Sequence, residues 1–169
     1  MGTLGTACGI ALERLGFNVR GWSRREKKVD GILCFFGDDQ IDSSLLDADI
    51  VVLLLPDTPL TQNILNQHTL NLLKRGAFVL NPGRGPLIDD DALLAALETG
   101  QIEHATLDVF RIEPLPQNHQ YWSNNKVTVI PHKASETRPK TASQVIAMNI
   151  ERAENGQELL YLVDRENGY

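Results

Sequence analysis

Cysteine is scarce in this sequence, and long hydrophobic runs and internal repeats are missing from it. The 169 residues include two cysteines, Cys8 and Cys34, which lack the paired spacing of a metal site or a redox motif. We therefore expect both to be buried thiols, and we predict no metal site. The longest apolar run, Ile50 to Leu55, is too short to cross a bilayer, and the N-terminus lacks the pattern of a secretory signal. These absences predict a cytoplasmic protein without a membrane partner.

An excess of positive charge is also missing. The chain has 16 Lys and Arg against 22 Asp and Glu, a formal net charge of −6, which argues against a nucleic-acid partner. No G-x-S-x-G elbow of a serine hydrolase and no phosphate-binding loop of the ATPase kind occurs. The histidines at 68, 104 and 119 show no zinc-site spacing, so we interpret them as structural or solvated. With 42% hydrophobic residues, the sequence predicts one domain with a substantial core.

What the chain does have is an alternation of apolar runs with segments of helical period. Strands are expected at residues 17–22, 31–36, 50–55, 77–80, 104–109 and 127–130, and helices at 3–15, 42–46, 61–74, 89–98 and 141–154. The continuous apolar run at 50–55 is typical of a parallel strand buried on both faces. The alternation predicts an α/β fold built on a parallel sheet.

Two glycines begin the first expected helix. Gly2 and Gly5 are three residues apart, like the second and third glycines of G-x-G-x-x-G, but the first glycine and a preceding strand are missing. In such a motif the glycines let the backbone approach a pyrophosphate at the helix N-terminus. The alternative is that both glycines merely allow close helix packing.

A serine and two arginines follow the next expected strand. An NAD-binding fold would place Asp or Glu there to bind the ribose 2′-hydroxyl, whereas this chain has Ser23, Arg24 and Arg25. A 2′-phosphate needs charge-assisted donors and would be repelled by a carboxylate. The residues therefore favour NADP over NAD, and the alternative interpretation is a solvated basic turn.

Three charged or titratable residues follow three later strands. They are Arg84, Glu113 and His132, and ligands of open parallel sheets bind outside the carboxyl ends of the strands. An imidazolium held by a carboxylate can donate a proton to a carbonyl oxygen while hydride arrives at the carbon. A guanidinium can hold the carboxylate of an α-keto acid. Taken singly, each residue has a plainer interpretation as an ordinary surface or hydrogen-bonded side chain.

Six motifs occur in the order found in one enzyme family. They are Gly2-Thr3-Leu4-Gly5, the segment from Leu55 to Thr61, Asn81-Pro82-Gly83-Arg84-Gly85, Leu107-Asp108-Val109-Phe110, Glu113-Pro114-Leu115-Pro116 and Pro131-His132-Lys133-Ala134. In these motifs the chain resembles the D-isomer-specific 2-hydroxyacid dehydrogenases over nearly its whole length. Trp22-Ser23-Arg24 and residues 163–169 resemble more narrowly the glyoxylate/hydroxypyruvate reductases within that family.

The resemblance implies reduction of a small 2-keto acid, glyoxylate or hydroxypyruvate, by NADPH, with NAD(H) also possible as cofactor. It makes Arg84, Glu113 and His132 the catalytic residues, and we call them the candidate trio. It also implies that Asp108 faces the nicotinamide carboxamide. Together with the reasoning above, the expected cofactor-binding residues are Gly2, Thr3, Leu4, Ser23, Arg24, Arg25, Leu55, Pro56, Thr61, Pro82, Gly83, Arg84, Asp108, His132 and Ala134.

Members of the family are about twice as long as this chain and include a second, substrate-binding domain. The resemblance therefore implies a Rossmann-like doubly wound parallel sheet that lacks its first strand and most of the substrate domain. We expect residues 1–137 to be the NAD(P)-binding domain, and residues 138–169 to be a helix and tail that return to the substrate domain. We also expect two unpaired strand edges, a truncated chain that is inactive by itself, and a homodimer at full length.

Two other functions stay open from the sequence. One is a dinucleotide-sensing or partner-binding module without turnover, although such a module does not need a proton donor at position 132. The other is an NAD-dependent dehydrogenase of another 2-hydroxy acid.

Overall fold

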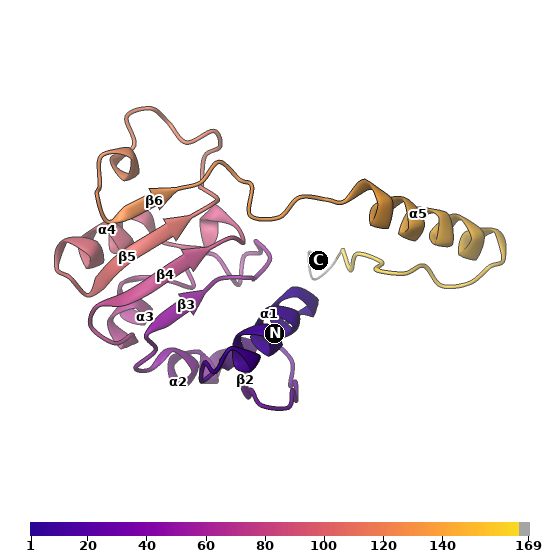
Figure 1. Cartoon of the computed structure of the whole chain (residues 1–169), viewed down its shortest axis with the longest axis horizontal. Helices are drawn as coiled ribbons and strands as arrows, with labels where there is room; N and C mark the ends of the chain where they lie inside the picture. Colours follow the sequence, from indigo (N-terminus) through magenta and orange to yellow (C-terminus); the bar gives the residue numbers. More distant parts are fainter. Residues whose placement is uncertain (166–169) are drawn as a thin grey trace.

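Two parallel β-sheets with flanking helices form the body of the molecule (Figure 1), in a computed structural model that describes residues 1–165. In the smaller sheet, β1 (Arg20–Ser23) pairs with β2 (Leu33–Phe36). The larger sheet has the order β3 (Ile50–Val52), β4 (Ala77–Asn81), β5 (Ile102–Leu107) and β6 (Val127–Val129). All pairings are parallel, which confirms the expected α/β class.

The sheet is interrupted between β1 and β3. Within the described residues β1 pairs only with β2, and β3 pairs only with β4, so each is an edge strand. A doubly wound sheet without its central first strand has this arrangement. Residues 166–169, the end of the expected C-terminal segment, lie outside the described residues.

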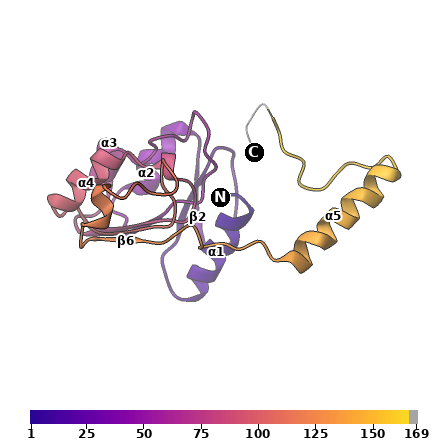
Figure 2. The ribbon, with the colours of Figure 1, turned by 90° about the horizontal axis from the view of Figure 1, so that it is seen from above.

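The hydrophobic core lies between the larger sheet and two helices, α3 (Gln67–Leu72) and α4 (Asp90–Glu98). Leu70, Leu93 and Leu97 on these helices are fully buried, as are Val79 and Ile102 on the strands. Burying one such side chain contributes roughly 1.5–3 kcal/mol. Figure 2 shows both helices on the same side of the larger sheet.

The other face of that sheet is exposed along its first two strands. Ile50, Val52 and Phe78 expose 47%, 39% and 44% of their surface. The expectation of a strand at 50–55 buried on both faces is therefore wrong on two counts: β3 ends at Val52, and one of its faces is open to solvent.

The helix expected at residues 61–74 is much shorter, because its first half folds into turns. The Thr61 hydroxyl donates to the Pro56 carbonyl at 2.7 Å and accepts from the Thr58 N–H at 2.9 Å. The helix then begins at a capping box, in which the Asn66 side chain accepts from Thr69 N–H and the Thr69 hydroxyl accepts from Asn66 N–H. Side-chain hydrogen bonds to the backbone therefore decide where α3 starts.

The remaining elements lie around this core. They are α1 (Thr3–Arg14), α2 (Ile41–Leu45) and the short 3₁₀ turns η1 (Asp38–Gln40), η2 (Gly85–Leu87) and η3 (Gln120–Trp122). Helix α2 packs against β1, β2 and α3, and so bridges the two sheets.

Cys8 and Cys34 are both only partly buried, which corrects the expectation of buried thiols.

The last helix, α5 (Pro139–Glu154), extends away from the body (Figures 1 and 2). None of its residues is buried, and Ile146, Met148 and Ile150 are exposed. Its hydrogen bonds to the following tail are local ones, such as the pair between Asn149 and Leu160. Among residues 1–165, no helix is long and apolar enough to cross a membrane.

Candidate active site at the carboxyl edge of the sheet

The candidate trio lies in loops that follow three adjacent strands. Arg84 follows β4, Glu113 follows β5 and His132 follows β6. Because these strands are parallel neighbours, their carboxyl ends meet at one edge of the sheet, which we call the carboxyl edge. The strand order thus brings together residues that are up to 48 positions apart in the chain.

Glu113 and His132 are in direct contact. His132 Nδ1 lies 2.7 Å from Glu113 Oε2, and the two side chains are 50% and 36% exposed. The second carboxylate oxygen, Oε1, accepts from the Phe110 N–H at 2.9 Å. The Glu113 carboxylate therefore orients the His132 imidazole. The Phe110 N–H, in the same loop as Glu113, orients the carboxylate.

The environment of Glu113 favours its charged form. Burial raises the pKa of this carboxyl, but the hydrogen bonds from His132 and Phe110 N–H and the positive charges of His132 and Arg84 outweigh burial. The pKa of Glu113 consequently lies below its usual range. A carboxylate that stays ionised is suited to hold a protonated imidazole beside it.

A buried aspartate shapes the turn that contains His132. Asp108, only 3% exposed, accepts from Lys133 N–H at 2.6 Å and from Ala134 N–H at 3.0 Å. The His132 N–H donates to the Asp108 carbonyl, and His132 has a positive φ of 51°. Such a backbone needs local support in a residue other than glycine. Asp108 therefore holds the His132 loop, a role that the sequence analysis missed.

Arg84 is presented by a tight segment that follows β4. The Asn81 side chain, which is buried, accepts from Gly83 N–H and donates to the Arg84 carbonyl. A Cβ at Gly83 would lie 2.7 Å from the Leu53 carbonyl oxygen, so glycine is needed for the loops after β3 and β4 to approach each other. Arg84 Nη1 donates to the Gly83 carbonyl at 2.7 Å. Asn81 lies in one of the six sequence motifs, but nothing in the sequence indicates its structural role.

The other expected cofactor residues lie at the ends of α1, β1 and β3. Gly2 is the N-cap of α1, and Thr3 and Leu4 are the first helical residues. No side chain caps this helix and its first turn has no acidic residue, so its N-terminal amides suit an anion. Within the described residues a Cβ would meet nothing within 4 Å at Gly2 and only Met1 Sδ, at 3.9 Å, at Gly5, so no packing contact in this chain requires either glycine.

Ser23 ends β1 and is buried, and its hydroxyl donates to the Arg25 carbonyl at 2.9 Å. This bond fixes the turn in which Arg24 and Arg25 lie. After β3, the hydroxyl bond between Thr61 and Pro56 closes the loop that begins at Leu55. Pro82 is half-buried beside Gly83.

Groups suited to a metal ion do not occur in the described part of the chain, where no cluster of three or more His, Cys, Asp or Glu side chains is arranged to hold one. The other histidines have structural partners. His68 bonds Asp42 at 2.8 Å and His104 bonds the Thr128 hydroxyl at 2.9 Å.

Comparisons with known proteins show the family of this chain. The family model for the NAD binding domain of D-isomer specific 2-hydroxyacid dehydrogenases matches residues 1–134. A glyoxylate/hydroxypyruvate reductase A from Serratia proteamaculans is 45% identical over 168 residues, which are 99% of this chain and 54% of the relative. The chain thus spans about half the length of the curated relatives it matches.

Solved structures give the same result. A D-isomer specific 2-hydroxyacid dehydrogenase from Xanthobacter autotrophicus, in complex with NADPH and MES, superposes with a TM-score of 0.96 at 46% identity, over 99% of this chain and 69% of that one. An NADPH-dependent glyoxylate/hydroxypyruvate reductase from Sinorhizobium meliloti, in complex with NADP and sulfate, has a TM-score of 0.95 at 33% identity, over 100% and 55% of the two chains. This chain belongs to the D-isomer specific 2-hydroxyacid dehydrogenase family and contains the NAD binding domain of that family.

Proposed function

We propose that this chain is the NADPH-binding part of a reductase that converts glyoxylate or hydroxypyruvate to the 2-hydroxy acid. The observation behind the proposal is the 2.7 Å contact between His132 Nδ1 and Glu113 Oε2 at the carboxyl edge, in the loops next to that of Arg84. A proton donor, a carboxylate that orients it and a cation for the substrate carboxylate are the groups such a reduction needs.

Each member of the candidate trio has a distinct task in this reaction. With Nδ1 engaged by Glu113, the other ring nitrogen of His132, Nε2, is available to donate its proton to the carbonyl oxygen of the 2-keto acid. Glu113 stabilises the imidazolium before that transfer and orients the ring. The Arg84 guanidinium pairs with the substrate carboxylate and draws charge toward the ketone oxygen.

The described residues fit a phosphorylated dinucleotide. The uncapped N-terminus of α1 suits a pyrophosphate, and Arg24 and Arg25 after β1 suit a 2′-phosphate. When bound, NADPH supplies the hydride that reaches the carbonyl carbon. The NADPH and NADP held by the Xanthobacter and Sinorhizobium relatives support this cofactor over NADH. We further propose that Asp108 faces the nicotinamide side of this site, next to the turn it supports.

The whole protein is proposed to be a cytoplasmic homodimer in which residues 138–169 contact the substrate domain and residues 1–137 bind the cofactor. The exposed apolar side chains on α5 support such a contact.

A chimera tests the reaction. The portion of the Serratia reductase that this chain does not match is joined to the chain, and NADPH oxidation is followed by absorbance with glyoxylate and with hydroxypyruvate. We expect turnover with at least one substrate, and a loss of about 10²–10⁴-fold in His132→Asn, since that is the usual contribution of a general acid. A chimera that binds NADPH without turnover would point to the sensing module instead.

Cofactor choice is tested on the chain itself by fluorescence titration with NADPH and NADH. We expect tighter binding of NADPH, and a preference that disappears in the double variant Arg24→Ala/Arg25→Ala. The matched control removes two cations elsewhere, Arg138→Ala/Lys140→Ala, and should leave the preference intact. Equal affinities for both cofactors in the unaltered chain would overturn the cofactor assignment.

A further inference from the structure

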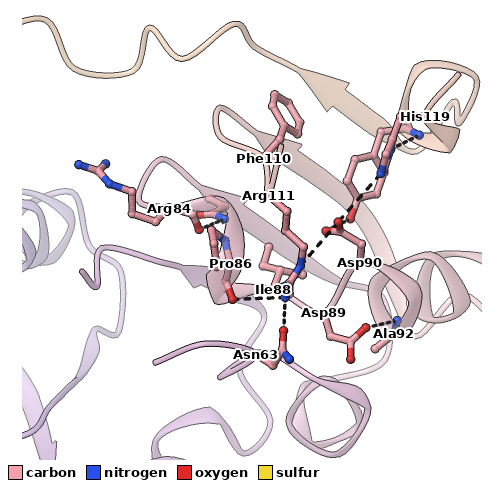
Figure 3. Close-up of polar contacts among 12 residues, drawn as sticks. Asn63, Arg84, Pro86, Ile88, Asp89, Asp90, Ala92, Phe110, Arg111 and His119 are labelled. Atoms are coloured by element: carbon pink, nitrogen blue, oxygen red, sulfur yellow. Dashed lines mark hydrogen bonds and ion pairs between the residues drawn. The ribbon is translucent and has the colours of Figure 1, made fainter. Parts of the chain in front are cut away.

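Arg111 connects three loops of the carboxyl edge. It lies in the loop after β5, two residues before Glu113, and its side chain points toward Pro86, Ile88 and Asn63 (Figure 3). Nη2 donates to the Asn63 side-chain oxygen and to the Ile88 carbonyl, and it lies 3.3 Å from the Pro86 carbonyl oxygen. One guanidinium therefore links the Glu113 loop to the Arg84 loop and to the loop that holds Thr61.

The position of Arg111 is itself fixed by an acidic partner. Its Nε lies 3.7 Å from Asp90 Oδ2, and both side chains are about one-third exposed or less. Asp90 accepts a hydrogen bond from the Tyr121 hydroxyl at 2.9 Å, and Tyr121 is buried. Burial and the charge of Asp90 raise the pKa of this phenol, so it remains a donor. The guanidinium is thus held in one orientation (Figure 3).

A steric contact places the same loop. A Cβ at Gly85 would lie 2.0 Å from the Phe110 carbonyl carbon and 2.4 Å from the Arg111 nitrogen. The backbone at residues 110 and 111 therefore rests directly on the residue that follows Arg84. Phe110 is also the residue whose N–H donates to Glu113, so a displacement at Arg111 reaches the carboxylate through a single intervening residue.

From these contacts we infer that Arg111 is a positioning residue: it pins the loop after β5 against residues 86–90 and so keeps Glu113 aligned with His132. The importance of this alignment for turnover rests on the proposed function, whereas the alignment itself can be measured without substrate or cofactor. Figure 3 shows the polar contacts of Arg111 with Asn63, Pro86 and Asp90.

The experiment is an NMR titration of the 169-residue chain that follows the Glu113 side-chain carbon and the Phe110 amide proton against pH. In the unaltered chain both signals should titrate together, below the usual range of a glutamate. In Arg111→Gln we expect the Glu113 pKa to rise by about 0.5–1, the size expected for loss of a hydrogen bond to a carboxylate. The Phe110 amide should then lose its response to this titration.

Two variants separate position from charge. Asn63→Ala leaves the charge of Arg111 in place and removes one of its acceptors, so a smaller rise in the same direction is expected. Arg111→Lys keeps the positive charge but not the planar guanidinium. The Glu113 pKa in this variant should lie between the values in the unaltered chain and in Arg111→Gln. Arg75→Gln is the matched control, since Arg75 also donates to a backbone carbonyl, that of Thr99, at a different place.

An unchanged Glu113 titration in Arg111→Gln, with a folded amide spectrum, would overturn the inference. If Arg111→Gln does not fold, an unchanged titration in Asn63→Ala and Arg111→Lys would overturn it equally. A chimera without turnover would instead count against the proposed function alone, because these titrations do not depend on catalysis.

Discussion

Asp108 and Arg111 stabilise loops by binding to polar groups from distant parts of the chain. Asp108 accepts from an amide 25 residues away, and Arg111 reaches Asn63, 48 residues away. No sequence spacing indicates such partners. Glu113 and His132 could be predicted to meet, because each follows a strand and the two strands are neighbours in a parallel sheet. The residues that set their orientation become visible only in three dimensions.

The first prediction concerns Asp108→Asn. An amide has one acceptor oxygen and presents N–H groups to a site where two backbone N–H groups converge, so one of them loses its partner. We expect the free energy of unfolding to fall by about 1.5–3 kcal/mol, as for a buried hydrogen bond to a charged group. Urea denaturation measures this change.

Glu103→Gln is the control for this substitution, since Glu103 is an exposed carboxylate on β5. Its effect should stay within about 0.5 kcal/mol. A similarly small effect in Asp108→Asn would show that the His132 turn does not depend on the Asp108 carboxylate.

The second prediction concerns pH. Because the pKa of Glu113 is lowered in the folded chain, its ionised form adds stability above the usual carboxyl range, and this contribution is lost as pH falls through the folded pKa. The unaltered chain should therefore be more stable than Glu113→Gln at neutral pH, and the difference should shrink below about pH 4.3, the ordinary glutamate value. Urea denaturation at pH 7, 5 and 3.5 follows the difference. A difference that stays constant with pH would contradict the prediction.

At the scale of elements, most strand ends and helix starts lie within two residues of the expected positions, and the exceptions are the end of β3 and the start of α3. The ends of β4, β5 and β6 lie within two residues of the expected positions, because apolar runs there are followed by turn residues. The expectation of a helix over 61–74 is wrong in its first half. Thr61 and Asn66 lie within a segment of helical period, but their side chains form hydrogen bonds with nearby backbone groups. Hydrophobic periodicity does not report such local competition.

The third prediction tests the capping box of α3. Asn66→Ala removes the acceptor for the His68 and Thr69 N–H groups and should cost about 1 kcal/mol of unfolding free energy. Asn66→Asp retains an acceptor at the N-cap and should preserve most of the stability. Thermal denaturation followed by circular dichroism compares the two. Equal losses in both variants would mean that the amide nitrogen, which bonds the Asn63 carbonyl, matters more than the cap.

At the scale of the whole molecule, burial is concentrated in the middle of the chain. The buried hydrophobic cluster runs from Val51 to Tyr121, and α5 contributes no buried residue. The free energy of unfolding therefore comes mainly from packing against the larger sheet. Helix α5 lies outside this packed region.

The fourth prediction follows from this distribution. A chain that ends at Thr137 should retain its free energy of unfolding within about 1 kcal/mol, since α5 contributes no buried residue and Asn149 bonds Leu160 within the same segment. Guanidinium denaturation of the two chains measures the difference. A loss of several kcal/mol would show that residues 138–169 support the core, and would overturn the proposed division at residue 137.

The interruption between β1 and β3 should let the two sheets open separately and at different free-energy cost. Because no backbone ladder joins the two sheets within residues 1–165, β1 and β2 can open without breaking the pairing of β3 to β6. A two-stranded sheet is only marginally stable by itself, so its amides should exchange with solvent faster than those of β4 and β5. Ser23, Arg24 and Arg25 lie on this weaker unit. A dinucleotide that contacts this unit at Arg24 and Arg25, and the loops of the larger sheet at Gly83 and His132, would therefore couple the two units and should raise the opening free energy of the weaker one.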